Sequence, residues 1–262
     1  MSAATAVGAG PGRTGISVVV ITLNEEKNIG ACLDAVAWAD ERLVVDSFST
    51  DATVSVAEGR GARVIQRAWP GLVGTQRNVG LDATSGPFVL FLDADERVTP
   101  ELRDELLRTA AAGEALAGAR IPRRNHFFGR WLRCTWPDYT SRFVRRGVGR
   151  YNEIAGKGFD AMVFGDGEVR DLRSPLDHFT GESLAQRLRK LDFDTTLQAG
   201  EKFRAGRSAS AWNLVLSPPF AFLRTFVLKR GFLDGWAGFV FSCLAAFNTF
   251  MKYAKLWELR SR

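Results

Sequence analysis

The stretch at residues 89–96, VLFLDADE, decides the fold class that the sequence predicts. Its apolar residues are typical of a strand buried in a parallel sheet, and they end at two acids, Asp93 and Asp95, separated by one small residue. Open α/β sheets bind ligands at the carboxyl ends of their strands. Because carboxylate oxygens suit Mg²⁺ or Mn²⁺, we predict that both acids bind a divalent cation there. The alternative is an acidic turn that only ends the strand, before a helix that starts near Thr99.

The composition is that of a globular protein with a positive net charge. The chain has 262 residues, of which 46% are hydrophobic and 24% are charged, and its net charge is +6. This length suits one large α/β domain, alone or with an appendage. The positive charge would suit nucleic acid, a membrane surface or a phosphorylated substrate, but the sequence has no recognisable nucleic-acid-binding module. We therefore predict that nucleic acid is not a partner.

Cysteine usage and the first residues point to the cytoplasm. Cys32, Cys134 and Cys243 are widely spaced and form no CxxC pair, which argues against structural disulfides and a cysteine zinc site and favours a reducing compartment. Residues 1–15 are rich in Gly, Ala, Pro, Ser and Thr and lack the apolar segment of a secretory signal. We predict that these residues form a flexible tail.

Strands alternate with helices over the first hundred residues. The predicted strands are residues 17–23, 42–46, 62–66 and 88–93, each a short run between polar residues. The predicted helices include residues 29–36, 54–57 and 75–81, and another starts at Thr99 and Pro100. Residues 24–26 and 49–51 supply predicted N-terminal caps. This alternation implies right-handed crossovers and a mostly parallel α/β sheet flanked by helices.

Polar residues follow three of the four predicted strands. Residues 24–26, Asp46 and Asp93 each stand where a strand ends, and the carboxyl ends of parallel strands meet at one edge of a sheet. Caps and turns favour the same residue types, so any one of these residues could be purely structural. Their recurrence at one edge indicates a binding site, because folding alone does not require acids at successive strand ends.

Four motifs in this half follow one another in the order of a known family. They are VVVITLNEEKNI at residues 18–29, VVDSFSTDAT at 44–53, GTQRNVGL at 74–81 and VLFLDADERV at 89–98. In this order they resemble the inverting glycosyltransferases of family 2, which have the nucleotide-sugar-binding, Rossmann-like GT-A fold. The resemblance covers about residues 16–110. It implies an enzyme that transfers a sugar from a nucleotide diphosphate, UDP in the first place, with Mg²⁺ or Mn²⁺ as cofactor.

The resemblance implies a nucleoside pocket at the first two motifs. The family segment that lines this pocket is matched by Thr22, Asn24 and Glu25. Asp46 matches the acid that accepts a hydrogen bond from the uracil ring, a role that suits a carboxylate. Ser49 and Asp51 lie beside it in the sequence and are expected to help close the pocket.

The other two motifs are implied to hold the diphosphate and the cation. The family helix that faces the diphosphate and the sugar is matched by Gln76, Arg77 and Asn78. Of these, Arg77 offers a charge-assisted contact to the diphosphate. Asp93 and Asp95 match the acids that bind the metal and the donor, and the second acid is usually the direct ligand.

Residues 119–150 contain nine arginines and one acid, Asp138, interleaved with aromatic residues. Such a segment could be a solvated basic face, or it could bind single-stranded nucleic acid by stacking and charge. We favour a third interpretation, a site for an anionic acceptor beside the diphosphate. The order NHFFGRWLR, then WPDYTSRFVRRG, resembles transferases that build lipopolysaccharide cores and related glycolipids. This narrower resemblance runs to the end of the chain and implies an anionic glycolipid or lipid-linked glycan as acceptor.

An inverting transferase needs a general base that takes the proton of the acceptor hydroxyl. Glu153 in RYNEIAGKG is the first candidate, because relatives often carry a His-Glu pair where this chain has Asn152 and Glu153. Asp138 is the second candidate. His178 in SPLDHFTGES stands where relatives also carry a histidine, and it is a candidate to complete the metal shell or to hold the diphosphate. For each of these side chains, a structural or exposed position is the alternative.

The last residues, 206–262, are aromatic and basic together. The uncharged run at residues 235–251 reaches only the lower bound for a membrane span and contains Gly, Ser and Asn, so we do not predict a span. The flanking lysines and arginines suit helices that lie in the interface of an anionic membrane, and a helix that closes the globular core is the alternative. The predicted parts are the tail at residues 1–15, a GT-A domain at 16–205 with halves at 16–118 and 119–205, and an amphipathic, membrane-associating segment at 206–262.

The sequence thus predicts a metal-dependent, inverting transferase that moves a hexose from a UDP-sugar to a lipid-linked or lipopolysaccharide-type glycan at the inner face of the cytoplasmic membrane. A phosphatase of the haloacid dehalogenase type is one alternative, since its nucleophile motif also has two acids spaced by one residue after an apolar strand. That motif is expected on the first strand, and Arg97 stands where it normally has Thr or Val. The other alternative is a non-catalytic, membrane-associated scaffold with the same fold.

Overall fold

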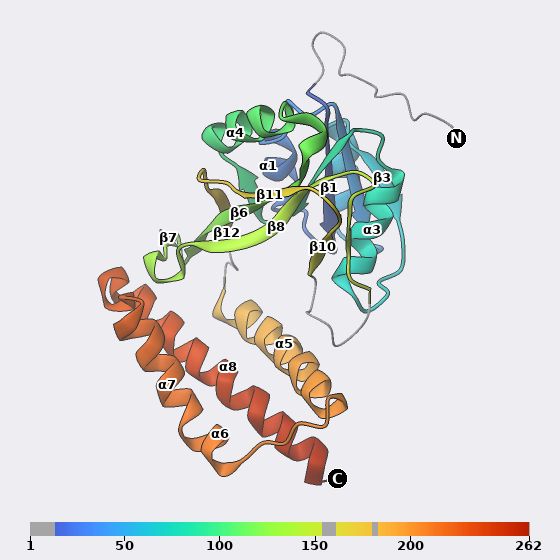
Figure 1. The fold of residues 1–262 in the computed structure, drawn as a ribbon. Coiled ribbons are helices and arrows are strands. Elements are labelled where there is room, and N and C mark those ends of the chain that lie inside the picture. The colour runs from blue at the N-terminus through green and yellow to red at the C-terminus, as the bar shows by residue number, and fades with distance from the viewer. Residues whose placement is uncertain (1–13, 154–160, 180–182, 262) are drawn as a thin grey trace. The chain divides into compact units, whose positions relative to one another are not determined.

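The computed structural model of the chain describes residues 14–153, 161–179 and 183–261 (Figure 1). Two compact units divide the chain: residues 139–153 and 158–177 join residues 1–123 in the first unit, and residues 124–138, 154–157 and 178–262 form the second. Most of the predicted tail lies outside the described residues. The amides of Thr14 and Gly15, however, donate to the Asp40 carboxylate at 2.8 Å, so these two residues belong to the folded part.

The first unit is built on a parallel sheet of β1 (Ile16–Thr22), β2 (Glu41–Asp46), β3 (Arg63–Gln66) and β4 (Phe88–Asp93). These strands lie in the order β3-β2-β1-β4 and pair in parallel. Thr22 lies opposite Asp46, and Ile21 lies opposite Asp93, so three strands end at one edge of the sheet. The four predicted strands and their parallel pairing are confirmed.

Further strands extend the sheet beyond β4. The order continues through β8 (Asp138–Arg145), β6 (Leu116–Phe127), β12 (Leu176–Phe179) and β5 (Glu96–Val98). β7 (Arg130–Trp131) and β11 (Glu168–Asp171) pair with β6, whereas β9 (Gly149–Tyr151) and β10 (Met162–Phe164) form a separate two-stranded sheet. Because β8 runs antiparallel to β4, the sheet is mixed around a parallel core.

The helices of the first unit are α1 (Ile29–Asp34), α2 (Thr53–Gly59), α3 (Val73–Ala83) and α4 (Pro100–Ala110), followed by a 3-10 helix at Gly113–Ala115. α3 lies very close to its neighbours at the two glycines of its motif. A Cβ at Gly80 would overlap the side chain of Val19 on β1, and a Cβ at Gly74 would lie 2.8 Å from the backbone oxygen of Asn152. Gly80 therefore lets α3 pack directly on β1, and Gly74 lets it approach the backbone that follows β9.

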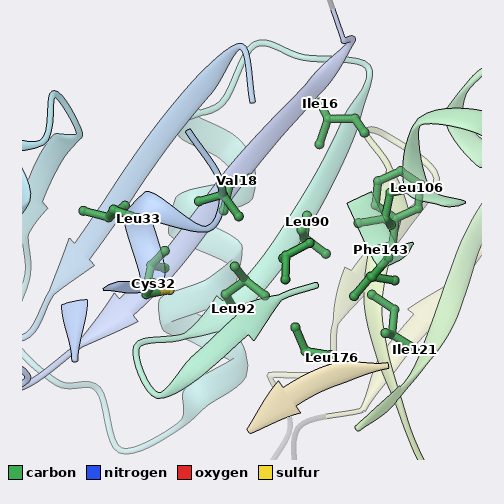
Figure 2. Close-up of a cluster of buried hydrophobic side chains, with 14 of the residues drawn as sticks. Ile16, Val18, Cys32, Leu33, Leu90, Leu92, Leu106, Ile121, Phe143 and Leu176 are labelled. Atoms are coloured by element: carbon green, nitrogen blue, oxygen red, sulfur yellow. The ribbon is translucent and has the colours of Figure 1, made fainter. Parts of the chain in front are cut away.

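Apolar side chains cover both faces of β1 and β4. Figure 2 shows one face, where Ile16 and Val18 of β1 and Leu90 and Leu92 of β4 lie in one cluster with Phe143 of β8. The alternate residues of the two strands are buried in a second cluster. The sequence predicts such burial for parallel strands with both faces covered.

The predicted helix caps are partly confirmed. The Thr99 hydroxyl caps α4 by accepting an amide hydrogen bond at 3.2 Å. The prediction that residues 24–26 cap α1 is wrong: Asn28 holds the N-cap position, without a side-chain bond and without an acid in the first turn. Residues 24–26 bond to the loop after β2 instead. At α2, Ala52 holds the N-cap position without a side-chain bond, so the prediction that residues 49–51 supply this cap is wrong. Asp51, one residue earlier, accepts the amide of Thr53 at 3.0 Å.

The second unit is mainly helical. Its helices are α5 (Leu184–Arg204), α6 (Ala211–Val215), α7 (Ser217–Leu223), a π-helical turn at Arg224–Leu228 and α8 (Gly235–Ser261), with 3-10 helices at Arg133–Thr135 and Gly231–Asp234. α5 and α7 both lie along α8 (Figure 1). The side chains of Phe127, Leu132 and Cys134 pack against α8 and complete the core of this unit.

One helical segment of the described chain is long and apolar enough to cross a membrane, judged on length and composition alone. It is residues 211–228, with a mean hydropathy of 1.2 over 18 residues, rather than the uncharged run at 235–251. The compact units also do not divide at the predicted boundary after residue 205, because α5 packs against α8. The predicted domain assignments stay predictions.

Candidate active site

The loops that follow β1 and β2 are joined by hydrogen bonds at the carboxyl edge of the sheet. The Asn24 amide donates to Ser49 Oγ at 2.8 Å, and the Asn24 side-chain oxygen accepts from the Thr50 amide at 2.8 Å. The Glu26 amide donates to Asp51 Oδ2 at 3.2 Å. Residues that were predicted from separate motifs to form a nucleoside pocket therefore lie together.

A second set of contacts fixes the same two loops. The Glu25 amide donates to Thr53 Oγ1 at 2.7 Å, and the Glu25 carboxylate accepts from Asn28 Nδ2 at 2.8 Å. Asn24 holds the turn in the left-handed region, with φ of 56°, which Asn tolerates better than most residues. Burial of Asp51 opposes its ionisation, but hydrogen bonds from Thr53 lower the pKa of this carboxyl below its ordinary value.

Asp46 is fully buried and accepts hydrogen bonds from its own chain on both carboxylate oxygens. Oδ1 accepts from the hydroxyls of Thr22 and Ser49 at 2.9 and 2.5 Å. Oδ2 accepts from the Ser49 amide at 2.9 Å and from Gln66 Nε2 at 3.4 Å. The bond from Gln66 is the longest, so Oδ2 is where a uracil N–H would compete most easily. The predicted contact with uracil stays a prediction.

Gln76 places an amide group beside the ends of β2 and β3. Its Nε2 donates to Ser47 Oγ at 2.9 Å and to the Arg67 carbonyl at 3.3 Å. Its Oε1 is buried and accepts no hydrogen bond from the residues that the structure describes. Because an unsatisfied buried acceptor costs about 1–3 kcal/mol, a ligand that donates to Oε1 would recover free energy.

Asp93 is held between two buried arginines. Its Oδ1 lies 2.7 Å from an Arg77 Nη atom, and its Oδ2 lies 2.5 Å from an Arg142 Nη atom. Burial opposes ionisation of Asp93, but the positive charges of Arg142 and Arg77 outweigh it and hold the pKa of the carboxyl well below its usual range. Since this pKa is depressed in the folded state, the ion pairs stabilise the protein at neutral pH and lose that contribution only in strong acid.

Arg77 also contacts an aromatic ring. Its guanidinium lies 5.0 Å from the centre of the Tyr151 ring, within the range of a cation–π interaction. The guanidinium is therefore fixed beside Asp93, at the edge where a diphosphate is expected. The predicted contact of Arg77 with the diphosphate stays a prediction.

Glu96 is a buried member of this cluster that the sequence did not predict as a site residue. Its Oε2 accepts the Asp93 amide at 2.9 Å, and its Oε1 lies 3.2 Å from Arg142 and 3.6 Å from Arg123. Arg142 was also missed, because it stands among polar residues in the strand sequence DYTSRFVR, where no local signal marks it as buried. Glu96 is the last residue of the VLFLDADE stretch, so its position directly after the two predicted metal acids was the available signal.

Replacing Glu96 by glutamine is expected to lower the free energy of unfolding by about 1.5–3 kcal/mol. The amide keeps the shape of the side chain but removes the negative charge that Arg142 and Arg123 face in a buried site. Urea denaturation measures the loss. Glu58→Gln on the exposed side of α2 is the matched control and should change stability by less than about 0.5 kcal/mol. A similarly small effect at Glu96 would show that its charge does not stabilise the cluster.

Asn78 connects α3 to β9 and to Glu153. Its Nδ2 donates to the Tyr151 carbonyl at 2.9 Å and to Glu153 Oε1 at 2.6 Å, and its Oδ1 accepts the Tyr151 amide at 3.0 Å. Asn78 is buried, whereas the Glu153 side chain is 45% exposed. The neighbouring α3 residue, Arg77, binds Asp93. α3 thus holds the candidate base and the first acid of the metal motif through adjacent residues.

Asp95 lies in the short turn between β4 and β5 and is partly exposed. Within the described part of the chain, no three His, Cys, Asp or Glu side chains converge as a complete metal site. Mg²⁺ in phosphate-transfer sites is often held by one or two carboxylates, with substrate phosphates and water filling the other positions. The residues fit such a cation, since Asp95 is partly exposed and Asp93 is engaged by Arg77 and Arg142. The predicted role of Asp95 as the direct ligand stays a prediction.

Two other predicted site residues lie in the second unit, where Asn125 bridges them. Asn125 Oδ1 lies 2.6 Å from Nδ1 of the buried His178, and Asn125 Nδ2 donates to Asp138 Oδ2 at 3.1 Å. Asn125 therefore fixes the position of the imidazole and of the carboxylate. The roles of His178 in metal binding and of Asp138 as a base stay predictions.

The arginines of residues 119–150 do not share one environment in the first unit. Arg120 pairs with Asp171 at 2.6 Å, and Arg150 pairs with Asp82 at 2.7 Å, whereas Arg142 is buried beside Asp93. Several of them therefore serve separate structural contacts. The predicted acceptor site in this segment stays a prediction.

The strands and helix that carry these residues lie within a region shared with a known family. The sequence model described as Glycosyl transferase family 2 matches residues 17–165. The chain belongs to this family. The predicted family and the GT-A type of α/β fold are thereby confirmed, and so is the assignment to the glycosyltransferases.

This transferase also resembles curated proteins over nearly its whole length. An uncharacterized glycosyltransferase of Rickettsia felis is 31% identical over 259 residues, which cover 93% of this chain and 89% of the relative. The lipopolysaccharide core biosynthesis glycosyltransferase LpsC of Rhizobium meliloti is 29% identical over 251 residues, which cover 93% of this chain and 92% of LpsC. A solved mycobacterial protein has a TM-score of 0.50 at 22% identity over 73% of this chain and 75% of its own, a likeness of fold alone.

Proposed function

We propose that this transferase is an inverting, metal-dependent enzyme that moves a hexose from a UDP-sugar to a lipid-linked or lipopolysaccharide-type glycan. The observation that carries the proposal is one edge of the sheet, where α3 connects three predicted elements of the site. Arg77 binds the acid Asp93, Asn78 binds the candidate base Glu153, and Gln76 lies beside the loop that contains Ser47, next to Asp46.

The nucleoside would bind at the joined loops after β1 and β2. Their polar groups converge on Asp46, whose Oδ2 has one long hydrogen bond that a uracil N–H could replace. Gln76 Oε1 offers a second buried acceptor near the same strand ends. Of these two acceptors, Gln76 Oε1 has no internal donor among the described residues, which favours a ligand over a purely structural role.

The diphosphate would lie toward Asp95 and Arg77. Asp95 would hold Mg²⁺ or Mn²⁺, and when bound this cation supplies positive charge that stabilises the leaving diphosphate. Arg77 and Arg142 add fixed positive charge within the same buried cluster, with Asp93 between them. Such preorganised charges need little rearrangement as negative charge develops on the leaving group.

Glu153 would take the proton of the acceptor hydroxyl while that oxygen attacks the anomeric carbon from the side opposite the diphosphate. The carboxylate is exposed enough to meet an acceptor, and its contact with Asn78 fixes its position. One displacement of this kind inverts the configuration of the sugar and requires no covalent intermediate.

The proposed acceptor rests on the similarity to LpsC, whose name assigns it to lipopolysaccharide core biosynthesis. At 29% identity this relative supports the class of acceptor rather than one molecule. A lipid-linked acceptor would place the transferase at the inner face of the cytoplasmic membrane, in agreement with the predicted reducing compartment.

Turnover of a panel of sugar nucleotides with Mg²⁺ or Mn²⁺ tests the proposed function. We expect hydrolysis or transfer with at least one UDP-hexose, and loss of that turnover when the cation is chelated. No detectable donor binding or hydrolysis across the panel would refute the proposal. UDP binding that does not depend on the cation, without turnover, would favour the scaffold alternative. The phosphatase alternative is disfavoured because the two acids follow β4 and not the first strand.

A further inference from the structure

The outer side of residues 211–228 is apolar and faces solvent. The exposed side chains that recur there at the spacing of one helix face are Trp212, Leu216, Phe220, Leu223 and Val227. They are between 47% and 71% exposed. The helix face that should be polar in water is therefore apolar.

The inner side of the same segment is already packed. The rings of Phe222 and Phe226 each lie 5.8 Å from the ring of Phe239 in α8. A surface helix of a soluble protein usually buries one apolar side and exposes a polar one. Since the inner side already packs against α8, the fold of this unit does not require apolar side chains on the outer side.

The turn into α8 continues this apolar surface. Phe232 and Leu233 are 50% and 56% exposed, and Trp236 is 81% exposed. The turn is anchored at Asp234, whose carboxylate accepts the Cys134 amide at 3.0 Å. A fixed turn thus holds three large apolar side chains in solvent. We term the outer side of residues 211–228 together with this turn the apolar ridge.

The charges around the apolar ridge are positive. Between residues 202 and 257 the sequence has a single acid, Asp234, and that side chain is buried. Arg224, Lys229 and Arg230 are exposed. An apolar surface with basic residues and no exposed acid is complementary to the headgroups and upper acyl region of an anionic bilayer.

We infer that the apolar ridge docks the transferase in the interface of an anionic lipid bilayer. Its aromatic and aliphatic side chains enter the boundary between headgroups and acyl chains, while Arg224, Lys229 and Arg230 contact lipid phosphates. The inference deepens the proposed function, because a transferase docked on the bilayer would meet a lipid-linked acceptor there. It rests on the proposed function for this purpose of docking alone.

The ridge lies on the bilayer rather than crossing it. Arg224 lies within residues 211–228, and the chain turns back at Gly231–Asp234 into α8. α8 packs along α5, whose charged residues include Asp192, paired with Lys255 of α8 at 2.8 Å. The charged residues of α5 and α8 would be costly in the hydrocarbon of a bilayer, so α8, which returns from the turn, does not span the membrane.

A second copy of the chain is a poorer occupant of the ridge. A two-fold symmetric interface would bring the same surface of both copies together. Arg224, Lys229 and Arg230 of one copy would then lie near those of the other, with no exposed acid in this segment to compensate. An anionic bilayer supplies the opposite charge.

Co-sedimentation of the full chain with vesicles tests the inference. The probes are phosphatidylcholine vesicles with and without about a third phosphatidylglycerol. The first variant replaces Arg224, Lys229 and Arg230 by Gln, and the second replaces Phe232, Leu233 and Trp236 by Ser. The matched control replaces the same number of arginines in the first unit by Gln, at Arg103, Arg108 and Arg173. All substituted ridge residues are exposed, so circular dichroism should show unchanged folding.

We expect the unmodified chain and the control to bind anionic vesicles, with binding that weakens as salt is added. The Gln variant should bind them roughly 100-fold more weakly, since each basic residue contributes about fivefold. The Ser variant should lose binding to both vesicle types. Absence of vesicle binding by the unmodified chain, or equal binding by the Gln variant, would overturn the inference. Self-association in lipid-free buffer that the Ser variant abolishes would also overturn it, in favour of a second copy.

UDP binding in the absence of vesicles separates this inference from the proposed function. If vesicle binding fails while cation-dependent UDP binding persists, only the docking surface is wrong. If vesicle binding holds while no sugar nucleotide binds or turns over, only the proposed function is wrong.

Discussion

Replacing Glu153 by glutamine is expected to reduce sugar transfer about 10²–10⁴-fold, the usual contribution of a general base. The amide cannot take the proton of the acceptor hydroxyl. It can still accept the hydrogen bond that Asn78 donates to Glu153 Oε1 at 2.6 Å, so the local geometry should persist. Steady-state kinetics should therefore show a fall in kcat with nearly unchanged donor affinity.

Asp166→Asn is the matched control for Glu153→Gln. Asp166 is an exposed acid in the turn before β11, and its replacement should leave kcat within a factor of about two. If Glu153→Gln retained activity at that level, the base would lie elsewhere. In that case a large loss in Asp138→Asn would assign the role to the second unit.

Replacing Asp95 by asparagine is expected to reduce transfer about 10²–10³-fold, because charge stabilisation of the leaving diphosphate would weaken. Asp95 is partly exposed, whereas Asp93 is engaged by Arg77 and Arg142. Asp95 is therefore the more accessible candidate ligand, and its replacement should cost less stability than replacement of Asp93, which two buried arginines engage. Calorimetric titration of Mn²⁺ in the presence of UDP should show weaker cation binding in step with the lost turnover.

Asp104→Asn on α4 is the control for Asp95→Asn, because Asp104 is an exposed acid that pairs with the neighbouring Arg103. Asp93→Asn is a poorer test. It would also remove the carboxylate that lies between the buried Arg77 and Arg142, so loss of folding would obscure loss of chemistry. Unchanged cation binding and turnover in Asp95→Asn would contradict the assignment of Asp95 as metal ligand.

The parallel core was predictable from the sequence because its signals are local. β1, β2 and β4 are short, mainly buried runs, and the polar residue at the end of each follows within the same stretch, as in the VLFLDADE stretch. The glycines of GTQRNVGL are explained by the close approach of α3 to Val19 and to Asn152. Local pattern and tertiary packing agree in this half, which is why the family motifs are also readable there.

The partners of the predicted site residues were not predictable, because they come from distant strands. Arg142 reaches Asp93 because β8 inserts antiparallel beside β4, with Phe143 opposite Leu90. Glu153 reaches Asn78 because β9 packs against α3. Neither pairing leaves a periodic trace in the sequence. The same limit explains the wrong prediction that residues 24–26 cap α1. These residues bond to the loop after β2, which is distant in the sequence.

The C-terminal helices show a related limit. Composition predicts a membrane-associating segment and draws attention to the uncharged run at residues 235–251. In the structure α8 packs against α5 and α7, and large exposed apolar side chains lie on residues 212–236 as well as at Phe247 and Phe250 within the uncharged run. Whether an apolar helix faces solvent or a neighbour depends on packing, and composition does not encode it.

A crystal structure with a UDP-hexose and Mn²⁺ tests the central claim most directly, namely that one edge of the sheet binds the donor. We predict the uracil ring within hydrogen-bond distance of Asp46, the cation bound to Asp95, and the anomeric carbon of the hexose facing Glu153. A nucleotide bound away from the carboxyl ends of β1, β2 and β4, or a cation without contact to Asp95, would contradict this account.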